Sequence, residues 1–103
     1  MGIRTLMAAV LVLCASAAGA AEVKVKIDNF TFQPAEIKVH VGDVIEWENE
    51  DDIPHTVTHS EFAFHSEALD TGDRFKFTFT DKGEFTYFCS LHPHMVGKVI
   101  VQD

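Results

Sequence analysis

The sequence is best interpreted outward from residues 89–95, Cys-Ser-Leu-His-Pro-His-Met. This stretch places a thiol, an imidazole and a thioether at intervals of three residues, on Cys89, His92 and Met95. Thiolate and thioether sulfur are soft donors that select copper, zinc or iron–sulfur centres, and imidazole suits copper and zinc. A buried free cysteine is common by itself. Here, however, the single cysteine and the single methionine beyond residue 20 lie together with a histidine between them, and we therefore predict a metal site.

The donor set favours copper over the other soft metals. Iron–sulfur clusters need several thiolates, and closed zinc sites use four cysteine or histidine ligands, for which a thioether is a poor substitute. One cysteine, two histidines and a weak axial methionine form the ligand set of a blue-copper centre. A second histidine must then come from elsewhere in the sequence. His55 is the best candidate, although it lies 34 residues before Cys89, a separation that only a tertiary fold can close.

Residues 1–20 have the pattern of a secretory signal peptide. A basic residue, Arg4, precedes an apolar stretch over residues 6–15, and small residues follow up to the expected cleavage site. The apolar stretch is far shorter than the roughly 20 residues that a membrane-spanning helix needs. The bulky Leu13 also argues against a lipid anchor on Cys14. We predict cleavage after residue 20 and a mature protein that is periplasmic and does not span the membrane.

The remaining 83 residues, 21–103, are predicted to form one domain and a monomer. Apart from Arg4, every charged residue lies in this part, which holds seven basic and 16 acidic residues, a formal net charge of −9. This balance excludes a nucleic-acid partner, which needs a basic footprint. It fits either simple solubility or electrostatic steering toward a redox partner with a basic docking surface.

Apolar residues alternate with polar ones in several short segments, which predicts β-strands. No segment has a sustained helical period, so we expect an all-β sandwich or small barrel with about seven to eight strands. Residues 48–52 are expected to form a solvated acidic loop, with partner docking as the alternative. Residues 59–73 are expected to form a long surface connection, and Gly97 is expected to end the metal-ligand loop. The expected strands centre on residues 23–27, 30–32, 37–41, 45–47, 75–79, 85–89 and 99–101.

The segment from Tyr87 to Val99 resembles the copper loop of the cupredoxins, and is most similar to their amicyanin and plastocyanin-like branch. The segment from Trp47 to Val57 resembles the part of that family that carries the first histidine. Phe32-Gln-Pro34, with Val41-Gly-Asp43, is similar to the family's opening strands. The resemblance covers nearly the whole chain after the leader.

This resemblance implies a Greek-key β-sandwich that binds one type 1 copper ion and shuttles single electrons outside the cytoplasm. The equatorial ligands would be His55, Cys89 and His92, the weak axial ligand would be Met95, and His92 would also be the electron port. The surrounding residues expected to support the ligands are Asn49, Thr56 and Ser90. Many members of the family have asparagine directly after the first histidine, and Thr56 offers fewer donors there.

The sequence is compatible with other functions and with other roles for the remaining histidines. A copper carrier that delivers the ion to another protein could use the same ligands, whereas an enzyme would need an open coordination position. His94 is expected on the rim of the copper site rather than on the metal. A second copper-capture site at His59 and His65, both in the long connection, is an alternative to a purely structural role.

Overall fold

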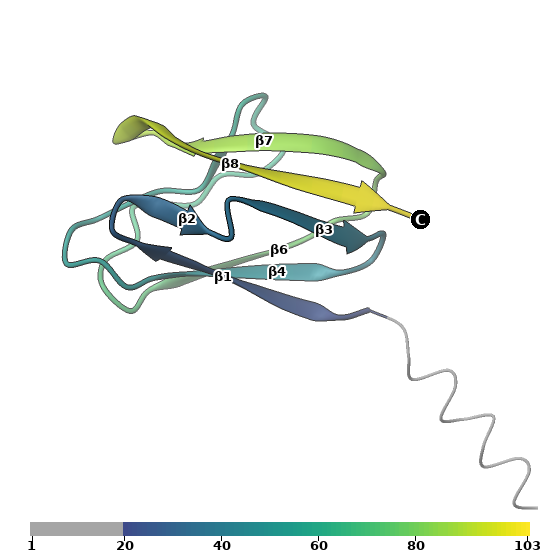
Figure 1. Cartoon of the computed structure of the whole chain (residues 1–103), viewed down its shortest axis with the longest axis horizontal. Coiled ribbons are helices and arrows are strands. Elements are labelled where there is room, and N and C mark those ends of the chain that lie inside the picture. The colour runs from purple at the N-terminus through teal and green to yellow at the C-terminus, as the bar shows by residue number, and fades with distance from the viewer. Residues whose placement is uncertain (1–19) are drawn as a thin grey trace, which may run out of the picture.

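The computed structural model describes residues 20–103, which form two four-stranded sheets packed face to face (Figure 1). The predicted all-β, Greek-key sandwich of seven to eight strands is confirmed, and these residues contain no helix. The predicted leader, apart from its last residue, lies outside the described residues. The first sheet contains, in spatial order, β2 (Thr31–Gln33), β1 (Glu22–Asp28), β4 (Val44–Asn49) and β6 (Arg74–Thr78). The second sheet contains β3 (Glu36–His40), β8 (His92–Gln102), β7 (Gly83–Cys89) and β5 (Thr58–His59).

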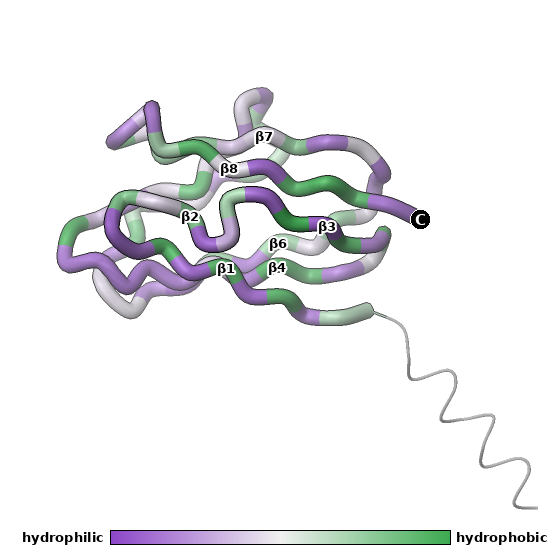
Figure 2. Tube along the Cα trace, viewed as in Figure 1, coloured by the Kyte–Doolittle hydropathy of each residue, from purple (hydrophilic) through white to green (hydrophobic). Residues whose placement is uncertain are grey.

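Alternating side chains of both sheets fill the space between them, and Figure 2 shows the corresponding changes in hydropathy along the strands. Trp47 on β4 is fully buried near the centre of this core. Its ring centroid lies 5.5 Å from that of Tyr87 on β7 and 5.8 Å from that of Phe64. Because these large aromatic rings bury much apolar surface, they join the two sheets into a stiff unit.

The two long strands β7 and β8 form a hairpin that is longer than the sequence predicted. We expected a ligand loop as far as Gly97. β8 begins at His92, which pairs with Cys89, but the register then shifts, so residues 93–95 have no partner on β7 and regular pairing resumes between Val96 and Phe88. Only Ser90 and Leu91 lie between the two strands. Pro93 and His94 are both exposed, so the alternation of buried and exposed side chains along β8 begins only at Met95. The expected loop is therefore an irregular stretch at the start of β8, and the expectation was wrong in placing the start of the strand after Gly97.

Residues 59–73 are not only a surface connection, which corrects the expectation from sequence. Phe64 and Leu69 are buried in the core, and Leu69 forms a two-way backbone bridge with His55. The amide of His59 also donates to the carbonyl of Phe64. The segment has isolated bridges instead of long strands, so it has no period that the sequence could reveal.

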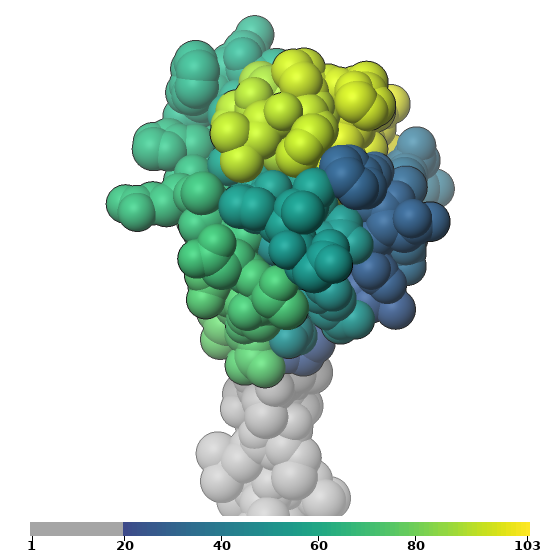
Figure 3. Space-filling view, turned by 90° about the vertical axis from the view of Figure 1, so that its left-hand side faces the viewer, coloured from purple at the N-terminus to yellow at the C-terminus, as the bar shows by residue number. Residues whose placement is uncertain are grey.

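Three segments meet at one end of the sandwich, on the left of Figure 1: the β1–β2 turn, residues 50–57, and the β7–β8 connection. Figure 3 views this end directly and shows the three segments side by side on the surface. The end formed by these three segments contains the candidate site.

In the part of the chain that the structure describes, no helix is long and apolar enough to cross a membrane.

Candidate metal centre

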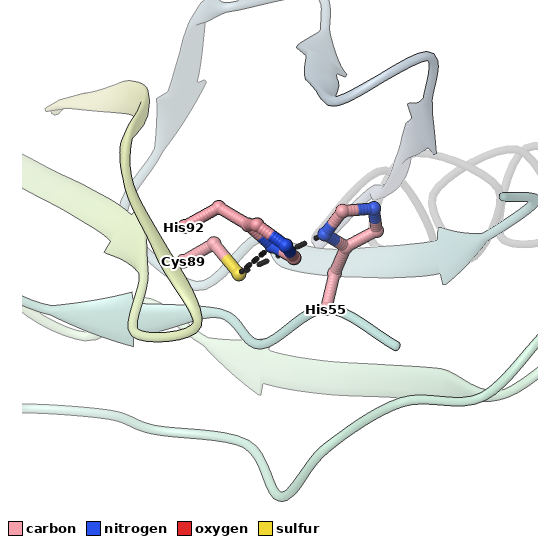
Figure 4. A group of neighbouring side chains, drawn as sticks. All are labelled: His55, Cys89 and His92. Carbon is pink, nitrogen blue, oxygen red and sulfur yellow. Dashed lines mark hydrogen bonds between the residues drawn. The ribbon is translucent and has the colours of Figure 1, made fainter. Parts of the chain in front are cut away.

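The fold brings His55, Cys89 and His92 together (Figure 4). The Nδ1 atom of His55 lies 3.7 Å from Cys89 Sγ, and the Nδ1 atom of His92 lies 3.6 Å from the same sulfur. Cys89 ends β7 and His92 begins β8, so the short hairpin connection fixes their spacing. Cys89 and His55 are completely buried, whereas His92 is partly exposed. Among residues 20–103, this is the one group of three such side chains close enough to hold a metal ion.

The spacing of the three donor atoms fits a shared metal ion. Metal–nitrogen bonds of about 2.1 Å and metal–sulfur bonds of about 2.3 Å, at an angle near that of a tetrahedron, separate nitrogen and sulfur by about 3.6 Å. The observed separations of 3.6 and 3.7 Å have this size. One soft thiolate with two imidazoles is a donor set for copper or zinc.

Residue Met95 lies on β8, three residues after His92, and its side chain is buried in the same core cluster as Cys89. His94, between them, is exposed, which agrees with the expected rim position. The buried position of Met95 leaves its thioether sheltered from water. A thioether is a weak ligand, so shelter from competing water is what such a ligand needs.

Asp51 holds the His55 ring from the side opposite Cys89. Asp51 Oδ2 lies 2.8 Å from His55 Nε2. Because an ionised carboxylate can only accept hydrogen bonds, the His55 proton lies on Nε2, and the Nδ1 lone pair faces the sulfur. Metal-binding histidines commonly donate their second ring nitrogen to a carboxylate in this way, which fixes both tautomer and ring orientation.

The Asp51 carboxylate also binds the tip of the β1–β2 hairpin. The amides of Asn29 and Phe30 donate to its two oxygens at 2.7 and 3.0 Å. Burial alone would raise the pKa of Asp51, but hydrogen bonds from Phe30, Asn29 and His55 outweigh it and lower the pKa to about 2. Asp51 is therefore ionised at neutral pH. The expectation that residues 48–52 form a wholly solvated loop was wrong at Asp51 and at the fully buried Asn49.

Asn49 shapes the loop that carries Asp51 and His55. Its amide nitrogen donates to the carbonyls of Ile53 and Leu69, and its oxygen accepts the amide of Asp51. The Asn49 side chain is fully buried, and these three hydrogen bonds satisfy both N–H donors of its amide group and one acceptor position of its oxygen. Asn49 thus sets the path of the chain between β4 and His55.

Thr56 ties the His55 segment to the Cys89 hairpin. Its hydroxyl oxygen accepts the Ser90 amide at 2.8 Å and also lies 2.9 Å from Ser90 Oγ and 3.0 Å from Thr58 Oγ1. The Thr56 amide donates to Cys89 Sγ at 3.3 Å. A small hydroxyl cluster therefore connects two segments that are 34 residues apart in the sequence.

His59 and His65 do not form a metal pair with the geometry of the central group. His59 is buried against Phe64, and its Nδ1 accepts the amide of Ala63 at 3.0 Å. His65 is exposed on the neighbouring segment. The structural role of His59 is clear from these contacts: its ring closes the turn that follows β5.

Two residues beside this group of three side chains, Asp51 and Phe30, were not identified from the sequence. The Phe30 ring lies edge-on to both histidines, with centroid distances of 5.3 Å to His55 and 5.0 Å to His92. Phe30 looked like a member of a strand pattern, and Asp51 looked like one acid among several. Neither residue carries a local signal that points to the site, because the β1–β2 turn brings Phe30 there and Asp51, in the loop after β4, holds that turn.

A model of the cupredoxin-like domain matches residues 3–101 of the sequence. The chain belongs to the cupredoxin-like family. Amicyanin from Paracoccus versutus is 33% identical over 78% of this chain and 64% of its own length. The chloroplastic plastocyanin of Tetradesmus obliquus is 35% identical over 85% of this chain and 71% of its own length. The chain spans just under two thirds of the length of the Paracoccus amicyanins that it matches.

Solved structures agree with this membership. A purple cupredoxin from Nitrosopumilus maritimus has a TM-score of 0.74 and 31% identity, covering 78% of this chain and 99% of that one. A copper-containing nitrite reductase from Thermus scotoductus has a TM-score of 0.75 and 29% identity, but this chain covers only 22% of it. The fold therefore occurs both as a small separate protein and as part of a larger enzyme.

Proposed function

We propose that this chain is an exported type 1 copper protein that carries single electrons between redox partner proteins. The observation that supports it most is the convergence of His55 Nδ1 and His92 Nδ1 on the buried sulfur of Cys89. The similarity to amicyanin and plastocyanin supports the same proposal. We assign His55, Cys89 and His92 as equatorial ligands and Met95 as the weak axial ligand.

When bound, copper supplies the one-electron couple, and the protein's own residues fix the ligands before the ion arrives. Asp51 and Asn49 hold the His55 segment, while Thr56 and Ser90 hold this segment to the β7–β8 hairpin. Ligands held in one arrangement by short connections on a stiff sandwich change little between oxidation states. Little rearrangement is what fast electron transfer needs.

Electron carriage has more support than copper delivery. A protein that hands copper to an acceptor needs ligands that the acceptor can reach, but Cys89 and His55 are fully buried. His92 is the partly exposed ligand, and three exposed apolar residues lie beside it. Leu91 lies in the β7–β8 connection, Val96 lies on β8, and the Phe30 ring lies edge-on to that of His92. We propose this surface as the electron port. A redox partner whose apolar contact surface is surrounded by basic groups would suit the formal net charge of −9 on residues 21–103.

We propose that the protein is not an enzyme by itself. The four assigned ligands leave no open position for a substrate, which a catalytic metal site keeps. The nitrite reductase that it resembles is much longer than this chain, which covers 22% of it. A turnover assay of the copper-loaded protein with nitrite tests this point, and sustained nitrite consumption would contradict it.

We also propose export and cleavage after residue 20, leaving one domain over residues 21–103. Cleavage there would create an ammonium group on Ala21, whose nitrogen lies 2.9 Å from Asp43 Oδ1. Asp43 is nearly buried, so the new charge would meet a carboxylate already in position. Mass spectrometry of the protein from periplasmic extracts should give the mass of residues 21–103. Recovery of the uncleaved chain alone would contradict this.

The spectrum of the purified, copper-loaded protein tests the central proposal. We expect intense visible absorption from the bond between Cys89 sulfur and Cu(II), which disappears on reduction. Cys89→Ser should abolish the band, because serine does not supply the thiolate. If the colour persisted in Cys89→Ser, the assigned sulfur ligand would be wrong. Stopped-flow electron exchange, run beside copper-transfer assays, would separate an electron carrier from a copper carrier.

A further inference from the structure

The β1–β2 turn has an unusual backbone for its sequence. Asn29 and Phe30 form a two-residue turn between paired residues Asp28 and Thr31, and both have positive φ angles, 56° and 58°. Such turns require the left-handed region at both positions, which asparagine and glycine adopt readily and bulky residues do not. A phenylalanine there is strained. Strain of this kind persists only where the surrounding structure holds the residue in place.

The Asp51 carboxylate holds the β1–β2 turn in this conformation. The carboxylate accepts the amides of both strained residues, so the turn docks onto the loop that precedes His55. The same Oδ2 atom that accepts the Phe30 amide also accepts His55 Nε2–H. One carboxylate therefore connects the turn to the ring of an assigned copper ligand.

The strained conformation places the Phe30 ring against both assigned histidines. Its centroid lies 5.3 Å from that of His55 and 5.0 Å from that of His92, with interplanar angles of 82° in each case. The two histidine rings are themselves 5.1 Å apart. Phe30 thus covers the side where the two rings meet, and it is 44% exposed on its outer face. Figure 3 shows that the β1–β2 segment shares the end surface with the β7–β8 connection.

We propose that Asp51 and the strained Phe30 turn form a third wall of the copper site, in addition to the two segments that carry the ligands. Asp51 is a positioning residue that fixes the His55 ring and favours Cu(II) through its negative charge. Phe30 limits rotation of both rings and keeps water from the metal on this side. The inference rests on the proposed copper-binding function and adds to it a device for retaining the ion and setting its potential.

Asp51→Asn tests the carboxylate, and Asp52→Asn is its matched control. Asp52 is the next residue, is exposed, and loses the same charge on substitution. In Asp51→Asn, the new side chain has no charge and keeps one acceptor oxygen. Its NH2 group replaces the second oxygen and places a donor against a backbone N–H donor. We expect copper loss to a chelator to accelerate by about 10- to 100-fold, the usual effect of removing a partner of a ligand. The reduction potential should rise by more than in Asp52→Asn, whose charge is screened by solvent.

Phe30→Asn tests the ring without disturbing the turn, because asparagine accepts the left-handed backbone. Phe62→Asn is the control: Phe62 also has a positive φ angle, 64°, is 70% exposed, and has a ring contact to His65 rather than to either assigned histidine. Both variants relieve similar strain, so neither should fold less well. Only Phe30→Asn should accelerate copper loss and change the paramagnetic spectrum of the Cu(II) protein.

The outcomes separate this inference from the proposed function. If the wild-type protein gives no type 1 spectrum, the proposed function fails and the variants need not be compared. A blue wild-type protein in which Asp51→Asn matches Asp52→Asn, and Phe30→Asn matches Phe62→Asn, in copper loss, potential and spectrum would overturn the third wall alone. Should Asp51→Asn fail to fold, the Phe30 and Phe62 pair still decides the question.

Discussion

The hydroxyl of Thr56 accepts the backbone amide of Ser90 at 2.8 Å, and so links the residue after one assigned ligand to the residue after another. Thr56 acts here as an acceptor with two hydroxyl neighbours, Ser90 and Thr58. Its hydroxyl therefore links the two segments that carry the assigned ligands.

Thr56→Ala should weaken this link, and Thr56→Ser should preserve it. Alanine removes the acceptor of the Ser90 amide, and because Ser90 is exposed we expect the loss of an ordinary hydrogen bond, about 0.5–1.5 kcal/mol. We expect the free energy of unfolding of the metal-free protein to fall by this amount, measured by urea denaturation. Copper-loaded Thr56→Ala should also lose the ion to a chelator faster. Equal behaviour of the alanine and serine variants would show that the hydroxyl has no such role.

Gly97 allows Tyr87 to lie flat across β8. The two residues are opposite each other in the β7–β8 pairing, and a Cβ atom at Gly97 would lie 2.5 Å from the Tyr87 ring. Burial raises the pKa of Tyr87 to about 12, so the ring is neutral and closely packed. Gly97→Ala should lower the free energy of unfolding by about 1–3 kcal/mol, as overpacking does. Val96→Ala, at an exposed neighbour, should have little effect in the same denaturation experiment.

Asp43 should make the stability of the protein depend on acid pH. The amides of Ala21 and His40 donate to its carboxylate and lower its pKa below the usual value. The unfolded chain then binds a proton at a higher pH than the folded one. Its stabilising contribution is present above the unfolded pKa of about 4 and is lost as the pH falls through the lower folded value.

Asp43→Asn should therefore reduce stability at neutral pH and flatten its decline in acid. Asp103→Asn is the control, because Asp103 is highly exposed and loses the same charge. Urea denaturation of the metal-free proteins between about pH 3 and pH 7 gives both effects. The assignment fails if Asp43→Asn and the wild-type protein lose stability in parallel over this range.

Electron self-exchange should depend on salt. Two copies of residues 21–103, which carry a formal net charge of −9, repel each other, and added salt screens the repulsion. We expect the exchange rate, measured from nuclear magnetic resonance line widths in mixtures of oxidised and reduced protein, to rise with ionic strength. Leu91→Glu, on the proposed port, should slow exchange without changing the visible spectrum. Unchanged exchange in Leu91→Glu would place the port elsewhere.

Much of this fold and site can be predicted from the sequence because the signals are local. Val25 and Ile27 alternate with lysines, and Cys89, His92 and Met95 have the spacing of a ligand set, so the strands and the metal-binding stretch are visible along the chain. The length of β8 was not visible, because a register shift opposite Cys89 leaves residues 92–95 without a regular alternation of buried and exposed side chains. Phe64 was missed because isolated bridges leave no period.

The supporting contacts were predicted less completely because they are not local. Asn49, Thr56 and Ser90 were expected near the ligands, and each makes hydrogen bonds in the ligand segments. Asp51 and Phe30 were not expected, because their role depends on a turn 21 residues from the loop that binds it. No sequence pattern in either segment predicts that contact.

The most direct test is anomalous X-ray diffraction at the copper absorption edge from crystals of the copper-loaded protein. We predict a single peak bonded to Nδ1 of His55, Sγ of Cys89 and Nδ1 of His92, with the Met95 sulfur on its axis. A peak at His59, His65 or His94 instead, or a His55 ring remote from the Cys89 sulfur, would contradict the account.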